Sequence, residues 1–159
     1  MRQVDHFIVG GGGGSAARKH SIWNPSTGEI QAEVALGDAA VLQRAVDAAK
    51  KVQPEWAATN PQKRARVMFE FKRLVEAEKQ ALAELLASEH GKVVEDAHGD
   101  IQRGLEVIEY ACGIPQALKG EYTPGAGPGI DVYSMRVPIG IGAGITPFNF
   151  PAMIPMWMF

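Results

Sequence analysis

The sequence is poor in cysteine and carries little net charge. Cys112 is the one cysteine among 159 residues, which excludes an internal disulfide framework and a zinc site built from cysteines. With a net charge of −2, the sequence does not have the excess of basic residues that binding to nucleic acid or to an anionic membrane surface requires. We therefore expect no nucleic-acid partner. The spacing of the four histidines does not match a metal site. They are His6, His20, His90 and His98.

A long uninterrupted apolar run is missing as well. The first residues contain no continuous apolar core of the kind that a secretory signal needs, so we expect a cytoplasmic protein, without separating the bacterial cytoplasm from the mitochondrial matrix. The uncharged stretch 145–159 is too short to span a bilayer, and prolines interrupt it. A membrane-surface anchor is the competing interpretation, but no basic residues flank the stretch. We expect instead a core segment of a longer chain that has been cut short, and no membrane partner.

Short extended segments fill the first 36 residues. Segment 6–9 is apolar and precedes a run of glycines, segment 20–23 leads into a turn at 24–28, and segment 29–36 alternates apolar and polar residues. Short strands around tight turns predict a small antiparallel sheet.

Helical periodicity begins after residue 38. Asp38 caps a first helix, which we predict to end near Pro54 because proline disrupts a helix interior. Asn60, followed by a proline, starts a long amphipathic helix that Gly91 stops. A third helix is predicted from about 93 to about 114. Its apolar stripe contains Val94, Ala97, Ile101, Leu105, Ile108 and Cys112.

The last forty residues predict one strand-turn-helix unit. Segment 120–129 is rich in glycine and proline and is typical of a connection, and 132–136 alternates like a strand. Segment 139–145 is an apolar run with small residues, which favours a strand buried on both faces. A turn at 146–149 then leads to a helix starting near Pro151. Together these elements predict an α/β architecture that is incomplete.

The first glycine run resembles a dinucleotide fingerprint only in form. Gly11, Gly13 and Ala16 have the spacing of that motif. The motif requires a helix whose N-terminus receives the pyrophosphate, whereas Pro25 ends the following segment after about two turns. We interpret the run as a hairpin loop.

The second glycine pattern is open to two interpretations. Gly140, Gly142 and Gly144 lie in the predicted strand before the turn that carries Asn149. Small residues there permit close packing of a helix over the strand or the approach of a flat ligand. Ligands of open α/β sheets bind at the carboxyl ends of the strands, which supports the second interpretation.

The segment 139–159 resembles the aldehyde dehydrogenases. In that family a strand ends in a signature of proline, aromatic, asparagine, hydrophobic and proline residues, which here is 147–151, PFNFP. Family-like marks also occur at 24–29, Trp56 and 89–92. Three segments are similar to sequences of the methylmalonate-semialdehyde dehydrogenase branch: PFNFPAMIPMWMF at 147–159, GDIQRGLEV at 99–107 and YAC at 110–112. The resemblance covers nearly the whole chain except the first glycine run.

The resemblance implies a fold and a chemistry. The fold would be aldehyde-dehydrogenase-like, with 1–137 as the N-terminal helical and strand part of the cofactor-binding domain and 138–159 as the truncated start of a Rossmann-type core. A cysteine nucleophile would attack a small semialdehyde, hydride would pass to NAD, and CoA would release the thioester. That nucleophile would lie beyond residue 159, and Cys112 is interpreted as an inert core thiol. The chain alone is therefore expected to oxidise no aldehyde, and the full-length protein to be a homo-oligomer.

The resemblance also implies roles for residues around the second turn. Asn149 matches the side-chain amide donor of the oxyanion hole, although an isolated asparagine there would be interpreted as a turn residue bonding its own backbone. Ile145, Thr146 and Phe148 match positions that line the dinucleotide. Ile145 and Phe148 are also compatible with plain core residues.

Arg103 matches a substrate-binding position of the branch. It lies away from the apolar stripe of its helix, and its guanidinium could bind the carboxylate of a malonate-type semialdehyde with two hydrogen bonds. The alternative is an ion pair with Asp100 or Glu106. A non-acylating aldehyde dehydrogenase and a non-catalytic binding or assembly module remain open as functions, and valine, pyrimidine or inositol breakdown would each fit the resemblance.

Overall fold

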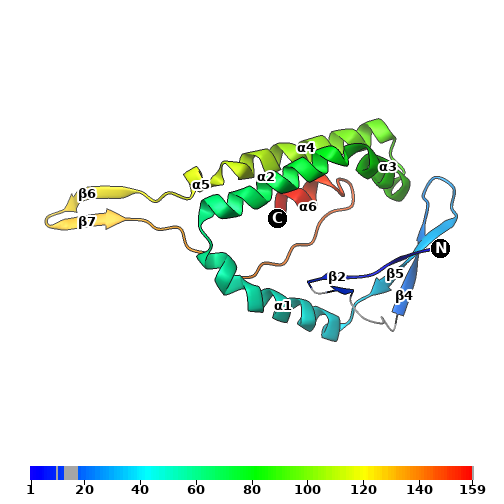
Figure 1. Ribbon diagram of the computed structural model, residues 1–159, viewed down its shortest axis with the longest axis horizontal. Coiled ribbons are helices and arrows are strands. Elements are labelled where there is room, and N and C mark those ends of the chain that lie inside the picture. The colour runs from blue at the N-terminus through cyan, green and yellow to red at the C-terminus, as the bar shows by residue number, and fades with distance from the viewer. Residues whose placement is uncertain (10, 13–17, 159) are drawn as a thin grey trace.

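The protein is elongated in the computed structural model (Figure 1). Helices α2 (Pro61–Ala77), α3 (Lys79–His90) and α4 (Val94–Cys112) form a central layer, with α6 (Met153–Met158) packed against α4. A small sheet lies at one end of the molecule and a two-stranded arm projects from the other. The structure describes residues 1–9, 11–12 and 18–158.

The sheet has the order β1-β5-β4, formed by β1 (Arg2–Val4), β4 (Arg18–Trp23) and β5 (Ile30–Leu36). The predicted antiparallel pairing is correct for β4 and β5. The third predicted strand, at 6–9, is not part of this sheet, and its place is taken by β1, which was not predicted and which pairs with β5 in parallel. Side chains add contacts to this pairing: the amide of Gln3 donates to Glu33 at 2.9 Å and accepts from Lys19 at 2.8 Å. The polar segment 2–4 has no strand periodicity that would reveal this pairing.

The first glycine run contributes to a small hairpin. Strand β2 (Phe7–Ile8) pairs with β3 (Gly11–Gly12) in antiparallel register. Gly13 and Ala16, the other residues of the apparent fingerprint, lie outside the described residues. Because Arg18–Trp23 is already a strand, the described part of this segment contains no helix that could cradle a pyrophosphate.

Helix α1 (Ala39–Ala58) is longer than predicted. Asp38 caps it as expected, its carboxylate accepting from the backbone N–H of Val41 at 2.9 Å. The predicted end at Pro54 is wrong, because the helix continues through that proline for another turn. Thr59 closes the last turn: its hydroxyl donates to the Glu55 carbonyl at 2.8 Å and its N–H to the Trp56 carbonyl. A proline removes one helical hydrogen bond, and a well-capped last turn tolerates that loss.

The predicted long helix is divided into α2 and α3. Asn60 caps α2 as predicted, and Gly91 ends α3 in the left-handed conformation with φ of 83°. The division falls at Glu78, whose N–H still donates to Leu74 and whose carbonyl still accepts from Leu82. The local change of direction lets both α2 and α3 pack against α4.

Helix α4 is the centre of the core. It matches the predicted third helix, ending at Cys112, and is followed by the short α5 (Ile114–Ala117). The apolar stripe is buried as predicted except for Val94, which is 38% exposed. Four residues of the stripe form one buried cluster with residues of α2, α3 and α6. The cluster comprises Val75, Ala83, Leu86, Ala97, Ile101, Leu105, Ile108 and Met156.

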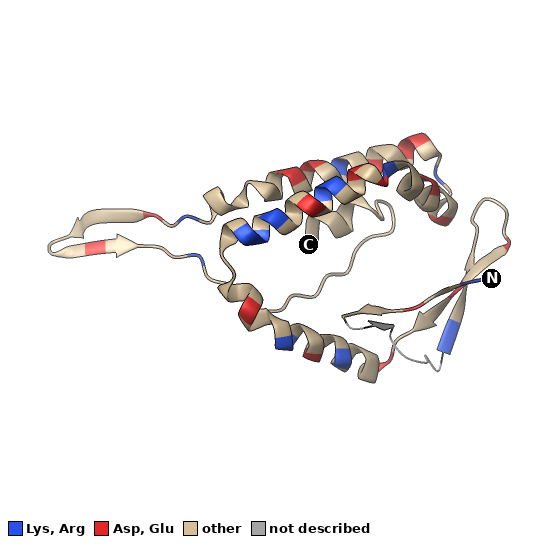
Figure 2. Ribbon diagram, viewed as in Figure 1, with Lys and Arg blue, Asp and Glu red and all other residues tan. Residues whose placement is uncertain are grey.

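Gly104 allows α6 to approach α4 closely. A Cβ atom at Gly104 would lie 2.4 Å from the Sδ of Met156 and 3.3 Å from the Cα of Met153. Both methionines are buried against α4. The helix predicted near Pro151 thus exists as α6, and part of the uncharged end of the chain forms core. Figure 2 shows this end without charged residues after Arg136.

The predicted connection 120–129 is wrong over most of its length. Strands β6 (Tyr122–Gly127) and β7 (Ile130–Tyr133) form the antiparallel arm. The carboxylate of Asp131 accepts from the Tyr122 hydroxyl and from the N–H of Gly125, across the two strands. The glycines that indicated a connection instead supply left-handed positions within the hairpin, as at Gly125 and Gly129.

The predicted strand 139–145 is not formed. The segment is irregular and exposed, with Ile139 at 101% and Ile145 at 96% relative accessibility. A strand buried on both faces needs hydrogen-bonding partners on its two sides, and within the described residues none pairs with this segment. No helix among the described residues is long and apolar enough to cross a membrane.

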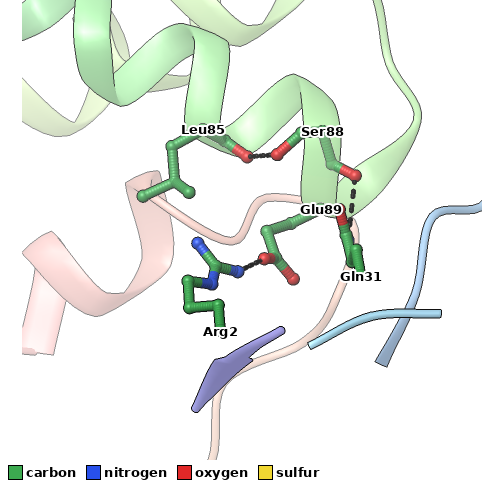
Figure 3. A network of polar contacts seen from close by, with 5 residues as sticks. All are labelled: Arg2, Gln31, Leu85, Ser88 and Glu89. Carbon is green, nitrogen blue, oxygen red and sulfur yellow. Dashed lines mark hydrogen bonds and ion pairs between the residues drawn. The ribbon is translucent and has the colours of Figure 1, made fainter. Parts of the chain in front are cut away.

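Polar contacts join the sheet to the helical layer (Figure 3). Arg2 on β1 forms an ion pair with Glu89 near the end of α3, and the Gln31 amide donates to the Ser88 carbonyl at 3.3 Å. A Cβ on Gly91 would lie 2.9 Å from Pro25 in the turn before β5. The left-handed glycine therefore also allows the chain to pass beside this turn.

The close packing at Gly104 yields a test with a matched control on the same helix. Gly104→Ala should overpack the α4–α6 contact, at a cost of about 1–3 kcal/mol. Gly99→Ala adds the same Cβ where nothing lies within 4 Å, so it should only gain helix propensity, up to about 1 kcal/mol. Urea unfolding followed by circular dichroism measures both. A Gly104→Ala protein as stable as Gly99→Ala would contradict the packing described here.

Candidate active site

Two residues singled out from the sequence line one cleft. Arg103 on α4 and Asn149 in the loop before α6 both border a cavity of about 440 Å³. The cleft lies between the start of α4 and this loop, and its remaining lining residues are Lys92, Glu95, Asp96, Gly99, Asp100 and Phe150.

Lys92 connects the two walls of the cleft. Its ammonium lies 3.4 Å from the Oδ2 of Asp100 and donates to the backbone carbonyl of Asn149 at 3.3 Å. It also lies 5.3 Å from the centroid of the Phe150 ring, a distance at which a cation and an aromatic face attract. The side chain of Lys92 is 13% exposed, and that of Asp100 is fully buried.

Asp100 also fixes the start of α6. Its Oδ1 accepts from the backbone N–H of Met153 at 2.7 Å. The carboxylate therefore satisfies one of the backbone donors that every helix start leaves unpaired, and its negative charge favours the helix N-terminus. Both oxygens of Asp100 therefore have a partner: Oδ2 lies beside the Lys92 ammonium and Oδ1 accepts from the Met153 N–H.

Arg103 is exposed and keeps its donors available. Among the described residues no ion pair or hydrogen bond joins it to Asp100 or Glu106, the partners of the alternative interpretation. Asp100 is committed to Lys92 and Met153. The guanidinium can therefore present its planar donor pair to an anion that enters the cleft.

Asn149 is held by its backbone and not by its side chain. Its carbonyl accepts from Lys92, and within the described residues its side-chain amide makes no hydrogen bond to its own backbone. The interpretation of a turn residue that bonds its own backbone is therefore not what the structure has. The amide remains exposed at the cleft and available as a donor.

The residues matched to the dinucleotide lie on the exposed segment that leads to Asn149. Ile145 is 96% exposed and Phe148 is 86% exposed, so neither is buried by the described residues, and Thr146 is exposed beside them. A Cβ on Gly140 or Gly142 would meet nothing within 4 Å, whereas one on Gly144 would lie 2.6 Å from the Sδ of Met158, so the close packing of a helix holds for Gly144 alone. Open apolar side chains, a hydroxyl and uncovered glycines fit one side of a site for a flat ring with a ribose.

Cys112 has the environment of a structural thiol. The residue is 7% exposed in the apolar stripe of α4, and burial raises the pKa of the thiol above its usual value. Because the thiolate is the nucleophilic form, this cysteine is unsuited to covalent catalysis. Among the described residues no group of three or more potential ligands could hold a metal ion.

Lys92 and Asp100 were not predicted as site residues. One signal was present in the sequence: Asp100 interrupts the apolar face of α4, beside Ala97, Ile101 and Gly104. A carboxylate on the buried face of a helix requires a partner, and this requirement could have directed attention to the preceding lysine.

The sequence model of the aldehyde dehydrogenase family matches residues 13–159. The chain therefore belongs to the aldehyde dehydrogenase family.

Within this family, the chain is similar to semialdehyde dehydrogenases. A malonate-semialdehyde dehydrogenase from Pseudomonas aeruginosa is 48% identical over 159 residues, covering 100% of this chain and 32% of the relative. The crystal structure of methylmalonate-semialdehyde dehydrogenase from Oceanimonas doudoroffii superposes with a TM-score of 0.94 at 46% identity, covering 99% of this chain and 32% of that one. A protein from Sinorhizobium meliloti 1021, provisionally assigned as a methylmalonate-semialdehyde dehydrogenase and complexed with NAD, gives a TM-score of 0.93 at 57% identity, with 99% and 32% covered.

These comparisons confirm the family and the aldehyde-dehydrogenase-like α/β fold, incomplete in this chain, that the sequence predicted. The chain spans about a third of the length of the relatives it matches.

The buried thiol of Cys112 should react slowly with alkylating reagents. With iodoacetamide at neutral pH we expect labelling to be at least about tenfold slower than for an exposed cysteine, because both burial and the raised pKa lower the accessible thiolate. Mass spectrometry follows the modification, and unfolding in urea should restore the ordinary rate. Rapid labelling of the folded chain would show that Cys112 is a reactive thiol.

Proposed function

We propose that this chain is part of an NAD-dependent, CoA-acylating methylmalonate- or malonate-semialdehyde dehydrogenase. The observation that carries the proposal is the convergence of Asn149 and Arg103 on one cleft. An exposed amide donor and an exposed guanidinium are the groups required for a substrate with an aldehyde at one end and a carboxylate at the other. The relatives named above support the same substrate class.

Asn149 supplies the stabilisation of developing charge. Attack on an aldehyde carbonyl places negative charge on its oxygen, and a preorganised amide donor at that oxygen contributes roughly 3–4 kcal/mol to lowering the barrier. The side chain of Asn149 is free of competing hydrogen bonds among the described residues, and the residue lines the cleft. Because Lys92 anchors the backbone carbonyl of Asn149, the loop need not move when the charge appears.

Arg103 binds the far end of the substrate. A guanidinium forms two parallel hydrogen bonds with a carboxylate, which fixes both the position and the direction of the substrate. Arg103 lies one helical turn after Gly99, and both line the cleft. The absence of a side chain at Gly99 leaves space beside the guanidinium for the bound carboxylate.

Ile145, Thr146 and Phe148 form one side of the dinucleotide site, with 138–159 as the first part of a Rossmann-type core and 1–137 as the helical and strand part of the cofactor-binding domain. NAD supplies the hydride acceptor when it is bound. The acyl group would be bound as a thioester to a cysteine outside these 159 residues, and it would pass to the thiol of CoA with release of that cysteine. An aldehyde dehydrogenase that releases the acid by hydrolysis would turn over without CoA.

The role of Asn149 can be tested in a chimera. In it these 159 residues replace the matching residues of the Pseudomonas aeruginosa relative, which supplies the remaining two thirds of the enzyme. We expect Asn149→Ala to lower kcat by about 10²- to 10³-fold with little change in KM, because the amide acts on the transition state. Gln102→Ala, which removes an exposed amide outside the cleft, should keep full activity.

The separate 159-residue chain should form no NADH with any aldehyde, because it has no reactive cysteine. An Asn149→Ala chimera with unchanged kcat would contradict the oxyanion role.

Arg103 should determine preference for a carboxylated substrate. Arg103→Leu in the chimera should lower kcat/KM for malonate semialdehyde by about 10- to 100-fold, the loss expected for hydrogen bonds to a charged group. The value for propanal, which has no carboxylate, should stay within about twofold. Arg73→Leu, which removes an exposed arginine paired with Glu70 on α2, is the control. Equal losses for both aldehydes would refute carboxylate recognition by Arg103.

A further inference from the structure

The loop that carries Asn149 is anchored at this residue and after it by one ion pair. Lysine has three N–H donors, and Lys92 directs them toward the Asp100 carboxylate, the Asn149 carbonyl and the Phe150 ring. Two of these contacts hold the loop, and Asp100 adds a third further along by accepting from the N–H of Met153 at 2.7 Å. The backbone is therefore fixed at Asn149 itself and four residues later.

The anchoring is removed from water. Asp100 has no exposed side-chain surface and Lys92 is 13% exposed, so solvent screens their interaction weakly. Lys79 on α3 is a lysine whose contact is open to solvent. It donates to Gln102 at 2.7 Å on an exposed surface and, among the described residues, forms no hydrogen bond or ion pair with the loop before α6.

We infer that Lys92 and Asp100 are positioning residues for Asn149, because their buried ion pair fixes the backbone from which the amide projects. The inference rests on the proposed oxyanion role of Asn149. The amide has no hydrogen bond of its own to the protein among the described residues, so the direction of the side chain depends on the backbone and its anchors. A buried pair of this kind often adds little net stability over an apolar replacement, which leaves geometry as its contribution.

The effect of the pair on catalysis is expected to be large. A misplacement of about 1 Å can cost about 10²-fold in rate, so Lys92→Met in the chimera should lower kcat by about 10- to 100-fold at little change in KM. Asp100→Asn retains an oxygen that can accept from Met153 but removes the charge, and it should show a loss in the same direction. Lys92→Arg keeps the cation and should restore most of the activity. Lys79→Met is the matched control and should behave like the unmodified chimera.

A double-mutant cycle separates positioning from general structural support. If Lys92 acts through Asn149, the double variant Lys92→Met/Asn149→Ala should be no slower than Asn149→Ala alone. If the two losses multiply, Lys92 acts by another route and the positioning role is overturned. If Asn149→Ala alone has no effect on kcat, the proposed function fails, which is a different result from failure of the positioning role.

The 159-residue chain provides a readout that does not depend on catalysis. Nitrogen-15 relaxation of the backbone amides of Asn149 and Phe150 should report restricted motion in the unmodified chain and in Lys79→Met. It should report increased motion in Lys92→Met or, if that variant does not fold, in Asp100→Asn. An amide equally restricted in all of the folded variants would overturn the inference.

Discussion

The carboxylate of Asp100 is the group on which the arrangement of the cleft depends. It lies in the apolar core of α4, where an unpaired charge would be strongly destabilising. Its two oxygens are satisfied by the ammonium of Lys92 and by the N–H of Met153. These partners lie at the end of the connection before α4 and at the start of α6. One buried charge therefore requires that two segments far apart in the sequence meet at the same place.

The packing of α6 completes this constraint. Gly104 lies one turn after Asp100 and leaves the space in which Met153 and Met156 pack against α4. The hydrogen bond at the start of α6 fixes the helix along its axis, and the methionine contacts fix its distance from α4. The loop before α6 then has little freedom, and Asn149 emerges from it beside Arg103. Polar anchoring and close apolar packing thus place an amide and a guanidinium in the same cleft.

The sequence predicted elements whose signals are local. The caps at Asp38 and Asn60, the glycine stop at Gly91 and the apolar stripe of α4 depend on neighbours within a few residues, and all are present. Long-range pairing was not predictable in the same way. The parallel strand β1 has no periodicity of its own, and Gly125 and Gly129 indicate equally a loop or a hairpin.

The predicted strand 139–145 needs partner strands that the described residues do not provide. In the cleft, the family signature located Asn149 and Arg103, but the dependence of that loop on Lys92 and Asp100 required coordinates, because it involves contacts across 57 residues of sequence.

The most direct measurement of the central claim is a titration of the 159-residue chain with malonate, followed by nuclear magnetic resonance of the Arg103 guanidinium and the Asn149 side-chain amide. Malonate carries a carboxylate for Arg103 and a second anionic oxygen that can accept from the amide. If the two residues form one substrate site, both signals shift with the same dissociation constant, and Arg103→Leu abolishes both changes. A shift of one signal without the other, or of neither, would contradict a shared site for a carboxylated aldehyde.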